Sequence, residues 1–397
     1  MEEVVRINLN EEAQEGRFSR FGLIPWWDQK KLANANILVV GAGALGNEIV
    51  KNLALLGAGN VMVVDMDLVE NSNLSRSVLF RERDNGRPKA VVAAEAAQRI
   101  FPQMKVRPFT GNAVYDLGLG VYRWADIVLA GLDNREARLS VNQNCYRVNR
   151  PWVDGAIEKL AGVARMFEPP DGACYECTMN ERDWQLLEMR RSCNLLSRED
   201  MQEGKVPTTP TVASVIAAMQ VQEAVKYLHG LPTLAGKGYV FNGVEQDNYI
   251  VEYVRKEQCF SHETYTPIVE LPGGVSDMGP KDLFDEARAD LGPDVVVELN
   301  RDIARSFRCR ECGREEDVFR SLGKVRESEA ACPHCGQTRE VLTTHTIAPG
   351  VDVADHTFEE LGVPPLDIVG VRAGMQQVFY EFRGDAQRVL GPLWGGQ

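Results

Sequence analysis

The chain of 397 residues contains no apolar run that approaches the roughly 18 or more residues needed to span a membrane. Its opening stretch, MEEVVRINLNEEAQEGR, is polar and acidic and lacks the pattern of a cleavable signal peptide. Basic residues are also in deficit, because 44 Lys and Arg stand against 57 Asp and Glu, a formal net charge of −13. We therefore expect a cytoplasmic protein that binds neither membranes nor nucleic acid.

Internal repeats and low-complexity tracts are absent as well, and the composition, 44% hydrophobic and 25% charged, is that of a globular protein. In the first half of the chain, strand patterns alternate with helix patterns. This order predicts an α/β fold, a doubly wound and mostly parallel sheet of the Rossmann type with right-handed crossovers. The expected strands are 37–40, 61–65, 105–109 and 126–131, and the expected helices end at Leu56 or span 89–100 and 134–149.

Later segments predict a different pairing. Residues 161–169 and the pair of strands within 238–254 have the pattern of antiparallel strands, and 211–230 has that of a buried helix. From about residue 265 the composition changes, beginning with the Pro/Gly-rich connection PIVELPGGVSDMGP and an acidic helix. We therefore divide the chain into residues 1–265 and a C-terminal region, 266–397, and expect a zinc ribbon at about 305–345.

The segment GAGALG (41–46) lies between a predicted strand and a predicted helix. Gly41, Gly43 and Gly46 would let backbone N–H groups approach a phosphate at the N-terminus of the helix. Asp65, at the end of the next strand, is placed to bond a ribose hydroxyl. This pattern alone also fits an NAD-dependent oxidoreductase.

Five further polar residues distinguish adenylation from hydride transfer. Asp67, Asn73, Arg76, Lys89 and Asp133 follow the ends of predicted parallel strands, where ligands bind in doubly wound sheets. A hydride transfer does not require two cations and a carboxylate there. Adenylation does, because charge builds up on the triphosphate of ATP when a carboxylate attacks its α-phosphorus, and cations and Mg²⁺ offset that charge.

GxGxxG, the pattern DMDLVENSNLSR (65–76), the lysine at 89 and DNREAR (133–138) together resemble the ubiquitin-activating enzyme superfamily. This superfamily includes the ThiF- and MoeB-like adenylyltransferases, which act on sulfur carriers. The resemblance covers about residues 15–264. It implies that Asp65 and Asp67 hold the ribose side of ATP, that Arg76 and Lys89 neutralise phosphates, and that Asp133 binds Mg²⁺.

The opening GRFSRFGLIP (16–25) is similar to the family pattern RYSRQ. By this resemblance, Arg20 reaches the γ-phosphate of ATP in a neighbouring subunit, which implies a homodimer with two active sites.

Six of the nine cysteines form three CxxC pairs. Such pairs in an intracellular protein indicate metal sites before disulfides. Cys309/Cys312 and Cys332/Cys335 have the spacing of a zinc ribbon. Family members combine the pair that matches Cys174 and Cys177 with a second pair after the last strand, and the corresponding place here, KEQCFSHE, holds Cys259 and His262. The resemblance thus implies a second Zn²⁺ site, with three thiolates and one imidazole.

Two of the other cysteines differ in setting. Cys145 falls in a helical pattern and is expected to be inert. Cys193 lies beside Arg190 and Arg191, which favour its thiolate, and it precedes a Pro-Thr-Thr stretch and the long helix. This arrangement resembles the compact activating enzyme of the ubiquitin-fold modifier, although about a dozen extra residues (194–205) intervene. The resemblance implies a thioester at Cys193, and an incidental thiol on a crossover loop is the alternative.

The sequence therefore predicts an enzyme that uses ATP to adenylate the C-terminus of a ubiquitin-like protein. The enzyme then transfers that protein to Cys193 for delivery to a conjugating enzyme, which the C-terminal region is hypothesised to dock. The nearest alternative is a sulfur-carrier adenylyltransferase that stops at the adenylate. A catalytically silent partner subunit and a tRNA-modifying relative are disfavoured, the first because the phosphate-binding residues are present and the second by the acidic charge.

Overall fold

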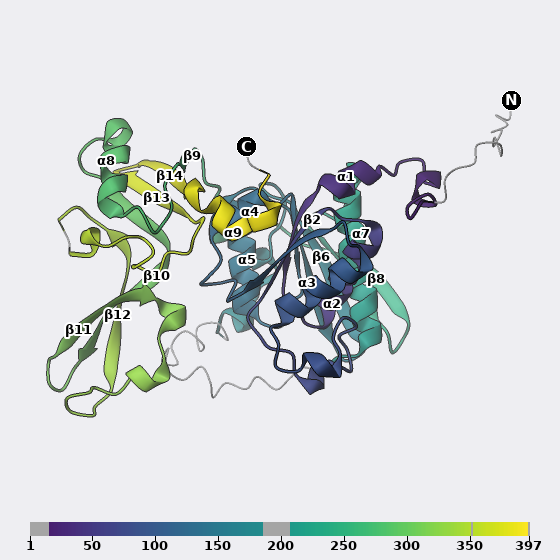
Figure 1. Ribbon diagram of the computed structural model, residues 1–397, viewed down its shortest axis with the longest axis horizontal. Helices are drawn as coiled ribbons and strands as arrows, with labels where there is room; N and C mark the ends of the chain where they lie inside the picture. Colours follow the sequence, from purple (N-terminus) through teal and green to yellow (C-terminus); the bar gives the residue numbers. More distant parts are fainter. Residues whose placement is uncertain (1–15, 186–206, 351, 396–397) are drawn as a thin grey trace.

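The structure is a computed structural model, and it describes residues 16–185, 207–350 and 352–395. Two β-sheets organise these residues (Figure 1). The larger sheet has eight strands in the order β3-β2-β1-β4-β5-β6-β7-β8. Its strands are β1 (Asn36–Val40), β2 (Asn60–Asp65), β3 (Lys105–Thr110), β4 (Ile127–Ala130), β5 (Trp152–Glu158), β6 (Ala161–Phe167), β7 (Lys237–Asn242) and β8 (Asp247–Glu252).

The first five strands of this sheet are parallel. Their crossovers contain α2 (Ala44–Leu56), α3 (Lys89–Ile100), α4 (Leu119–Trp124) and α5 (Arg135–Arg147). In the central strand β1, Ile37 and Val39 face one hydrophobic cluster, with α2 and α3, and Leu38 and Val40 face the other, with α4 and α5. A strand buried on both faces reads as a continuous apolar run, which is why ILVV predicted it. The expected doubly wound α/β fold is confirmed.

Strands β5 to β8 pair in antiparallel fashion, as expected for 161–169 and 238–254. Helix α7 (Pro210–His229) packs against β5 and β6, and also against α2. It begins after Thr209, whose side chain accepts a hydrogen bond from the amide of Val212, and ends at Gly230, which has a φ of +73°. These capping residues explain why the predicted helix, 211–230, agrees so closely with α7.

The C-terminal region forms a second sheet around one long strand, β10 (Val296–Cys309). The order is β11-β10-β13-β14-β9, and β12 also pairs with β10. The other strands are β9 (Ile268–Leu271), β11 (Glu315–Ser321), β12 (Arg339–Ile347), β13 (Ile368–Ala373) and β14 (Gln376–Phe382), and the helices are α8 (Pro280–Leu291) and α9 (Ala386–Leu390).

One expectation for this region is wrong. The Pro/Gly-rich composition predicts a connection at residues 268–271, but they form β9, which pairs in parallel with β14. Ile268 is opposite Phe379, more than a hundred positions later in the chain. The short apolar run gains its structure from this distant partner, so local composition gave no sign of it.

The C-terminal region shares a hydrophobic core with the larger sheet. Leu366, Ile368 and Leu390 belong to the same buried cluster as Leu38 and Val40 of β1. Figure 1 shows the yellow helix α9 against α4, on the face of the sheet that α4 and α5 cover. The region is therefore packed onto this face and does not hang from a linker.

Helix α7 has 20 residues, yet neither it nor any other helix within the described ranges is long and apolar enough to cross a membrane.

We predict that Leu390→Ala lowers the free energy of unfolding by about 2–5 kcal/mol, since it deletes a fully buried side chain from the shared core. Urea titration followed by circular dichroism measures this loss. The control is Met375→Ala, at a fully exposed site in the turn between β13 and β14, which should change the value by less than about 0.5 kcal/mol. Equal values for the two variants would contradict the shared core.

Candidate functional site

The glycine-rich turn joins β1 to α2 at the C-terminal edge of the parallel strands. Gly41 has a φ of +95°, and a Cβ on it would lie 2.5 Å from the carbonyl oxygen of Gly131, just beyond β4. A Cβ on Gly46 would lie 1.9 Å from the carbonyl oxygen of Gly41. These two glycines are therefore required by close packing of the backbone.

Gly43 has a different setting. It is the N-cap residue of α2, and a Cβ on it would meet no atom within 4 Å. The N-terminus of α2 thus faces open space, and its first amides are available to an anion. The three glycines of the pattern divide into two that serve packing and one that leaves room for a ligand.

Asp65 ends β2 beside this turn. Its carboxylate accepts hydrogen bonds from the backbone amides of Ala42, at 2.7 Å, and Asp67, at 2.8 Å. Burial raises the pKa of Asp65 above its ordinary value, although these two amides and the Lys89 ammonium partly oppose the rise. A carboxylate has about four acceptor positions, so Asp65 can still accept a hydroxyl hydrogen bond.

Lys89 is the first residue of α3, and it contacts the loop that follows β2. Its Nζ lies 2.7 Å from Oδ2 of Asp67, and its amide donates to the carbonyl oxygen of Asp67 at 2.9 Å. The lysine side chain is 12% exposed, whereas that of Asp67 is 57% exposed. A cation at a helix N-terminus opposes the helix dipole. A carboxylate or a bound anion is needed to stabilise it there.

Asn73 and Arg76 lie on the same loop but do different things. The buried Asn73 side chain accepts a hydrogen bond from the amide of Glu70 at 3.0 Å, which holds the turn. Arg76 is half-buried, and its Nη1 donates to the carbonyl oxygen of Ser72 at 2.8 Å in an exposed hydrogen bond. The structure thus gives Asn73 a structural task and leaves the Arg76 guanidinium at the surface.

Asp133 is exposed on the loop between β4 and α5. Its Oδ1 accepts a hydrogen bond from the side chain of Asn134 at 3.1 Å. The N-cap of α5 is Asn134, whose Oδ1 accepts from the amide of Ala137 at 2.8 Å. Asp133 is therefore not occupied as the helix cap.

A buried ion cluster that sequence reasoning missed supports this loop. Arg138 donates to the carbonyl oxygen of Leu132 and, at 3.0 Å, to Oδ1 of Asp154; Oδ2 of Asp154 accepts from Nε of Arg165 at 2.9 Å. Burial by itself raises the pKa of Asp154, but the two guanidinium groups outweigh it and hold the pKa below its ordinary value. In the sequence, Arg138 ends the motif DNREAR and Asp154 lies in the segment WVDGA (152–156). These two charged residues were the available signs of the cluster.

Arg20 lies outside this edge of the sheet. It is exposed and immediately precedes a single turn, η1 (Phe21–Leu23), ahead of α1 (Gln29–Asn34). Figure 1 shows this purple segment at the periphery of the fold, and its Phe18 packs against the core beside Phe101, after α3. Leu23 and Trp26 of the segment are also exposed, with 82% and 42% of their surface accessible.

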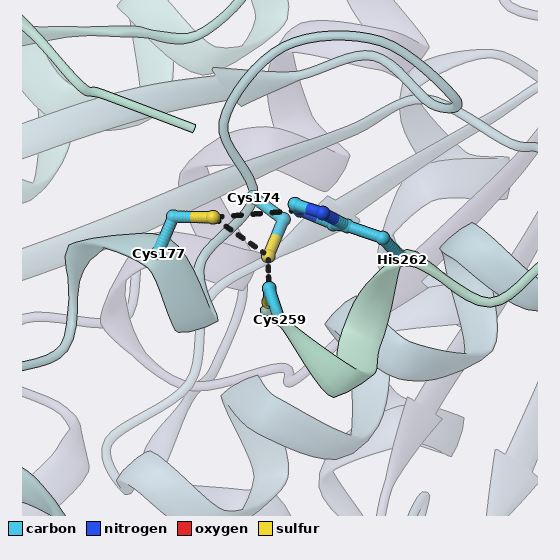
Figure 2. Close-up of side chains that lie close together, drawn as sticks. All are labelled: Cys174, Cys177, Cys259 and His262. Atoms are coloured by element: carbon cyan, nitrogen blue, oxygen red, sulfur yellow. Dashed lines mark hydrogen bonds between the residues drawn. The ribbon is translucent and has the colours of Figure 1, made fainter. Parts of the chain in front are cut away.

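The first cysteine cluster gathers side chains from two distant segments, as Figure 2 shows. Sγ of Cys174 lies 3.7 Å from Sγ of Cys177 and 3.5 Å from that of Cys259, and Nε2 of His262 lies 3.4 Å from Sγ of Cys177. All four ligand atoms lie within 4.8 Å of one another. The His262 ring stacks on Tyr146, with the ring centroids 5.3 Å apart. Three thiols and one imidazole at such distances can hold one tetrahedral metal ion.

The second cluster is built from two similar turns. In the first, the amide of Cys309 donates a hydrogen bond to the carbonyl oxygen of Arg314. The amide of Gly313, which has a φ of +71°, donates to the carbonyl oxygen of Cys309. In the second, the amide of Cys332 donates to the carbonyl oxygen of Gln337, and the amide of Gly336 donates to that of Cys332. Gly336 has a φ of +73°.

These two turns bring four thiols together. Sγ of Cys309 lies 3.5 Å from that of Cys335, and Sγ of Cys312 lies 3.8 Å from that of Cys332. Hydrogen bonds from the backbone amides of Cys335 and His334 lower the pKa of Cys332 to about 6. The second turn thus stabilises the thiolate form of Cys332, the form that a metal ion requires.

The remaining cysteines discussed above are Cys145 and Cys193. Cys145 is fully buried in the hydrophobic cluster of α4 and α5, and this burial raises its pKa well above the ordinary value, as expected of an inert thiol. Cys193 lies outside the described residues, as do Arg190 and Arg191.

Comparison with known proteins places this site in a family. The ThiF family model matches residues 16–261. The chain is 38% identical over 156 residues to the NEDD8-activating enzyme E1 catalytic subunit of Schizosaccharomyces pombe, which is 38% of this chain and 35% of that protein. It is 30% identical over 243 residues to the sulfur carrier protein adenylyltransferase of Thermus thermophilus, which is 58% of this chain and 83% of that protein.

Among solved structures, Escherichia coli MccB with ATP superposes with a TM-score of 0.52 at 24% identity, over 63% of this chain and 75% of that one. This likeness shows a shared fold. The chain spans only about a third of the length of the NEDD8-activating relative. The family match covers the glycine-rich turn, Asp65, Lys89, Asp133 and most of the first cysteine cluster, and the chain belongs to the ThiF family.

Proposed function

We propose that this chain uses ATP and Mg²⁺ to adenylate the C-terminal carboxylate of a ubiquitin-like protein. The observation that carries this proposal is the arrangement of polar groups at the ends of three adjacent strands. The open N-terminus of α2 follows β1, the Asp65 carboxylate and the Lys89–Asp67 pair follow β2, and Asp133 follows β4.

Each of these groups has a proposed role. Asp65 accepts from the ribose of ATP, and Asp67 lies on the same side of the nucleotide. Lys89 and Arg76 neutralise phosphate oxygens, with Lys89 leaving its bond to Asp67 for the stronger charge of the triphosphate. Mg²⁺, held by Asp133, supplies further positive charge to the phosphates.

In the reaction, a carboxylate oxygen of the ubiquitin-like protein attacks the α-phosphorus of ATP. The bond from that phosphorus to the bridging oxygen breaks, and pyrophosphate leaves. The nucleophile is already an anion, so this step needs no general base. The developing charge is offset by Lys89, Arg76 and, from a second copy of the chain in a homodimer, Arg20.

A second step would transfer the activated protein to Cys193. The thiolate attacks the carbonyl carbon of the acyl-adenylate, AMP leaves, and a thioester forms that a conjugating enzyme can accept. The similarity to a NEDD8-activating enzyme supports a ubiquitin-like protein as the substrate of both steps. The second candidate is a sulfur-carrier adenylyltransferase that stops at the adenylate, and it is supported by the Thermus relative, most of whose length the chain covers.

We also propose that each cysteine cluster holds one Zn²⁺. Both offer four ligands within tetrahedral reach, and three or four thiolates suit Zn²⁺ well. Zn²⁺ at Cys174, Cys177, Cys259 and His262 would join the segment after β6 to the segment after β8. The second ion would hold the ribbon between β10 and β12, where the conjugating enzyme is proposed to dock.

Adenylation predicts ATP–pyrophosphate exchange that depends on a ubiquitin-like protein. We expect Lys89→Ala and Asp133→Asn each to lower the exchange rate by about 100-fold or more. The first removes a positive charge that offsets the triphosphate, and the second removes the proposed ligand of the Mg²⁺ ion that does the same. The control is Lys105→Ala, which removes an exposed lysine at the opposite end of β3 and should leave the rate unchanged. Full exchange in the Asp133→Asn variant would contradict the proposed Mg²⁺ site.

The thioester predicts a covalent adduct that a thiol reagent removes. Intact mass of the enzyme incubated with the ubiquitin-like protein, ATP and Mg²⁺ should show this adduct in the native chain and none in Cys193→Ala. Cys193→Ser should instead give an ester that resists the thiol reagent. Pyrophosphate release without an adduct in the native chain would exclude the thioester and favour the sulfur-carrier class.

The two metal sites predict two Zn²⁺ ions per chain by elemental analysis. Cys177→Ser and Cys312→Ser should each lower the content to one, because each removes a ligand from a different cluster. Cys145→Ala, which changes a thiol outside both clusters, should retain two. A single variant that loses both ions, or a native chain with fewer than two, would count against two independent sites.

A further inference from the structure

The loop of residues 111–118 follows β3 at the edge of the sheet that carries the proposed nucleotide site. At its start, the amide of Gly111 donates to the carbonyl oxygen of Asp65 at 3.3 Å. Farther along, the hydroxyl of Tyr115 donates to Oε1 of Glu136 at 3.2 Å. Glu136 is in the first turn of α5, three residues after Asp133. The loop therefore contacts both the backbone of Asp65, whose carboxylate is proposed to bind the ribose, and the helix beside the proposed Mg²⁺ ligand.

Hydrogen bonds within the loop set its shape but not its position. Oδ1 of Asn112 accepts from the amide of Val114 at 2.8 Å, and Oδ2 of Asp116 accepts from the amide of Asn112 at 2.9 Å. These bonds join residues two and four positions apart, so they would persist if the whole loop moved. Contacts from outside the loop must decide where it lies.

Such contacts come from the C-terminal region, through Arg301 of β10. Nη1 of Arg301 donates to the carbonyl oxygen of Val114 at 2.7 Å, and Nη2 lies 3.4 Å from that of Leu117. Nη2 also lies 3.4 Å from Oδ2 of Asp367. The arginine side chain is only 15% exposed, and the aspartate side chain is 2% exposed. Partial burial strengthens these bonds compared with bonds at the surface.

Asp367 is fixed in turn by the larger sheet's own helix. Its Oδ1 accepts from the amide of Leu119, the first residue of α4, at 2.7 Å. Arg301 is therefore held by a carboxylate that α4 also holds, and its planar guanidinium reaches two carbonyl groups of the loop. A lysine could reach only one point of this arrangement at a time.

A second contact comes from the ribbon. Gly323 lies in η6 (Leu322–Lys324), directly after β11, and a Cβ on it would be 2.7 Å from Cγ of Tyr115. The glycine thus lets the backbone of the ribbon approach the Tyr115 ring, whose hydroxyl contacts Glu136. Two elements outside the residues matched by the family model therefore contact the same loop.

We propose that Arg301 is a positioning residue for ATP: through the loop 111–118, the C-terminal region completes the nucleotide site of the larger sheet. The inference rests on the proposed function, because it concerns the affinity of that same site. Without Arg301, residues 111–116, which precede the fully buried Leu117, sample other positions, and ATP must order them on binding. The intrinsic contacts stay the same, but the fraction of molecules ready to bind falls, and the apparent affinity falls with it.

The test compares the full-length chain with Arg301→Ala, Arg301→Lys and Gly323→Ala in ATP–pyrophosphate exchange. We expect Arg301→Ala to raise KM for ATP about tenfold, with kcat and KM for the ubiquitin-like protein within about twofold. Arg301→Lys should recover part of this loss, since it restores one bond to the loop. Gly323→Ala should raise KM for ATP by an independent route, since its Cβ displaces Tyr115.

The matched control is Arg107→Ala. Arg107 of β3 also joins the two regions through backbone carbonyl groups, those of Arg388 and Val389, each at 3.3 Å, but it does not belong to the loop. Its loss should leave KM for ATP within about twofold. A rise equal to that of Arg301→Ala would overturn the proposal, because general loosening of the C-terminal region would then explain both.

Other outcomes are equally decisive. A fall in kcat for Arg301→Ala without a change in KM for ATP would indicate a smaller active fraction and a purely structural role, which overturns the proposal. A native chain that shows no exchange at all would overturn the proposed function itself. A native chain that exchanges normally, with all Arg301 variants alike, would refute only the positioning role.

Discussion

The backbone and side chain of Asp65 connect the parts on which the proposed site depends. Its carboxylate accepts hydrogen bonds from the glycine-rich turn and from the loop after β2, and its carbonyl oxygen accepts from the start of the loop after β3. Burial makes the charge costly, as the raised pKa indicates, and the amides and the nearby Lys89 offset that cost. One residue thus joins three chain segments at one edge of the sheet.

The second constraint is the junction between the two sheets. Leu366, Ile368 and Leu390 complete a hydrophobic cluster on one face of the larger sheet, and Arg301 and Asp367 add buried polar bonds beside it. Burial of this kind fixes position far better than a flexible linker does. Because the larger sheet and the C-terminal region are packed together, a change in one can alter the position of loops in the other. No rigid-body movement of either part is needed.

The two cysteine clusters illustrate different ways to assemble four ligands. The turns at 309–314 and 332–337 are each closed by their own backbone bonds, so each pair of thiols is shaped locally. At the other cluster, Cys174 and Cys177 meet Cys259 and His262, which follow the paired strands β7 and β8 in the chain. The first kind of site follows from spacing, and the second depends on the completed sheet.

Features that have a local cause could be predicted from the sequence. A strand buried on both faces reads as ILVV, and helix ends are marked by Thr209 and Gly230. The CxxC-Gly pairs encode their turns, and the ordered set of Asp65, Lys89 and Asp133 follows from the placement of strand ends. Even the meeting of Cys174 with His262 was anticipated, but only through the family resemblance.

Features that join distant positions in the chain depend on tertiary packing and could not be predicted in this way. Strand β9 needed β14 as a partner, Asp154 needed both Arg138 and Arg165, and Arg301 found Val114 nearly two hundred residues earlier in the chain. Periodicity and turn chemistry act over a few residues, whereas these contacts arise when packing brings two surfaces together. The physical reason is that a buried charge or a short strand is stable only beside its partner. The local sequence pattern around either residue does not indicate which distant residue that partner is.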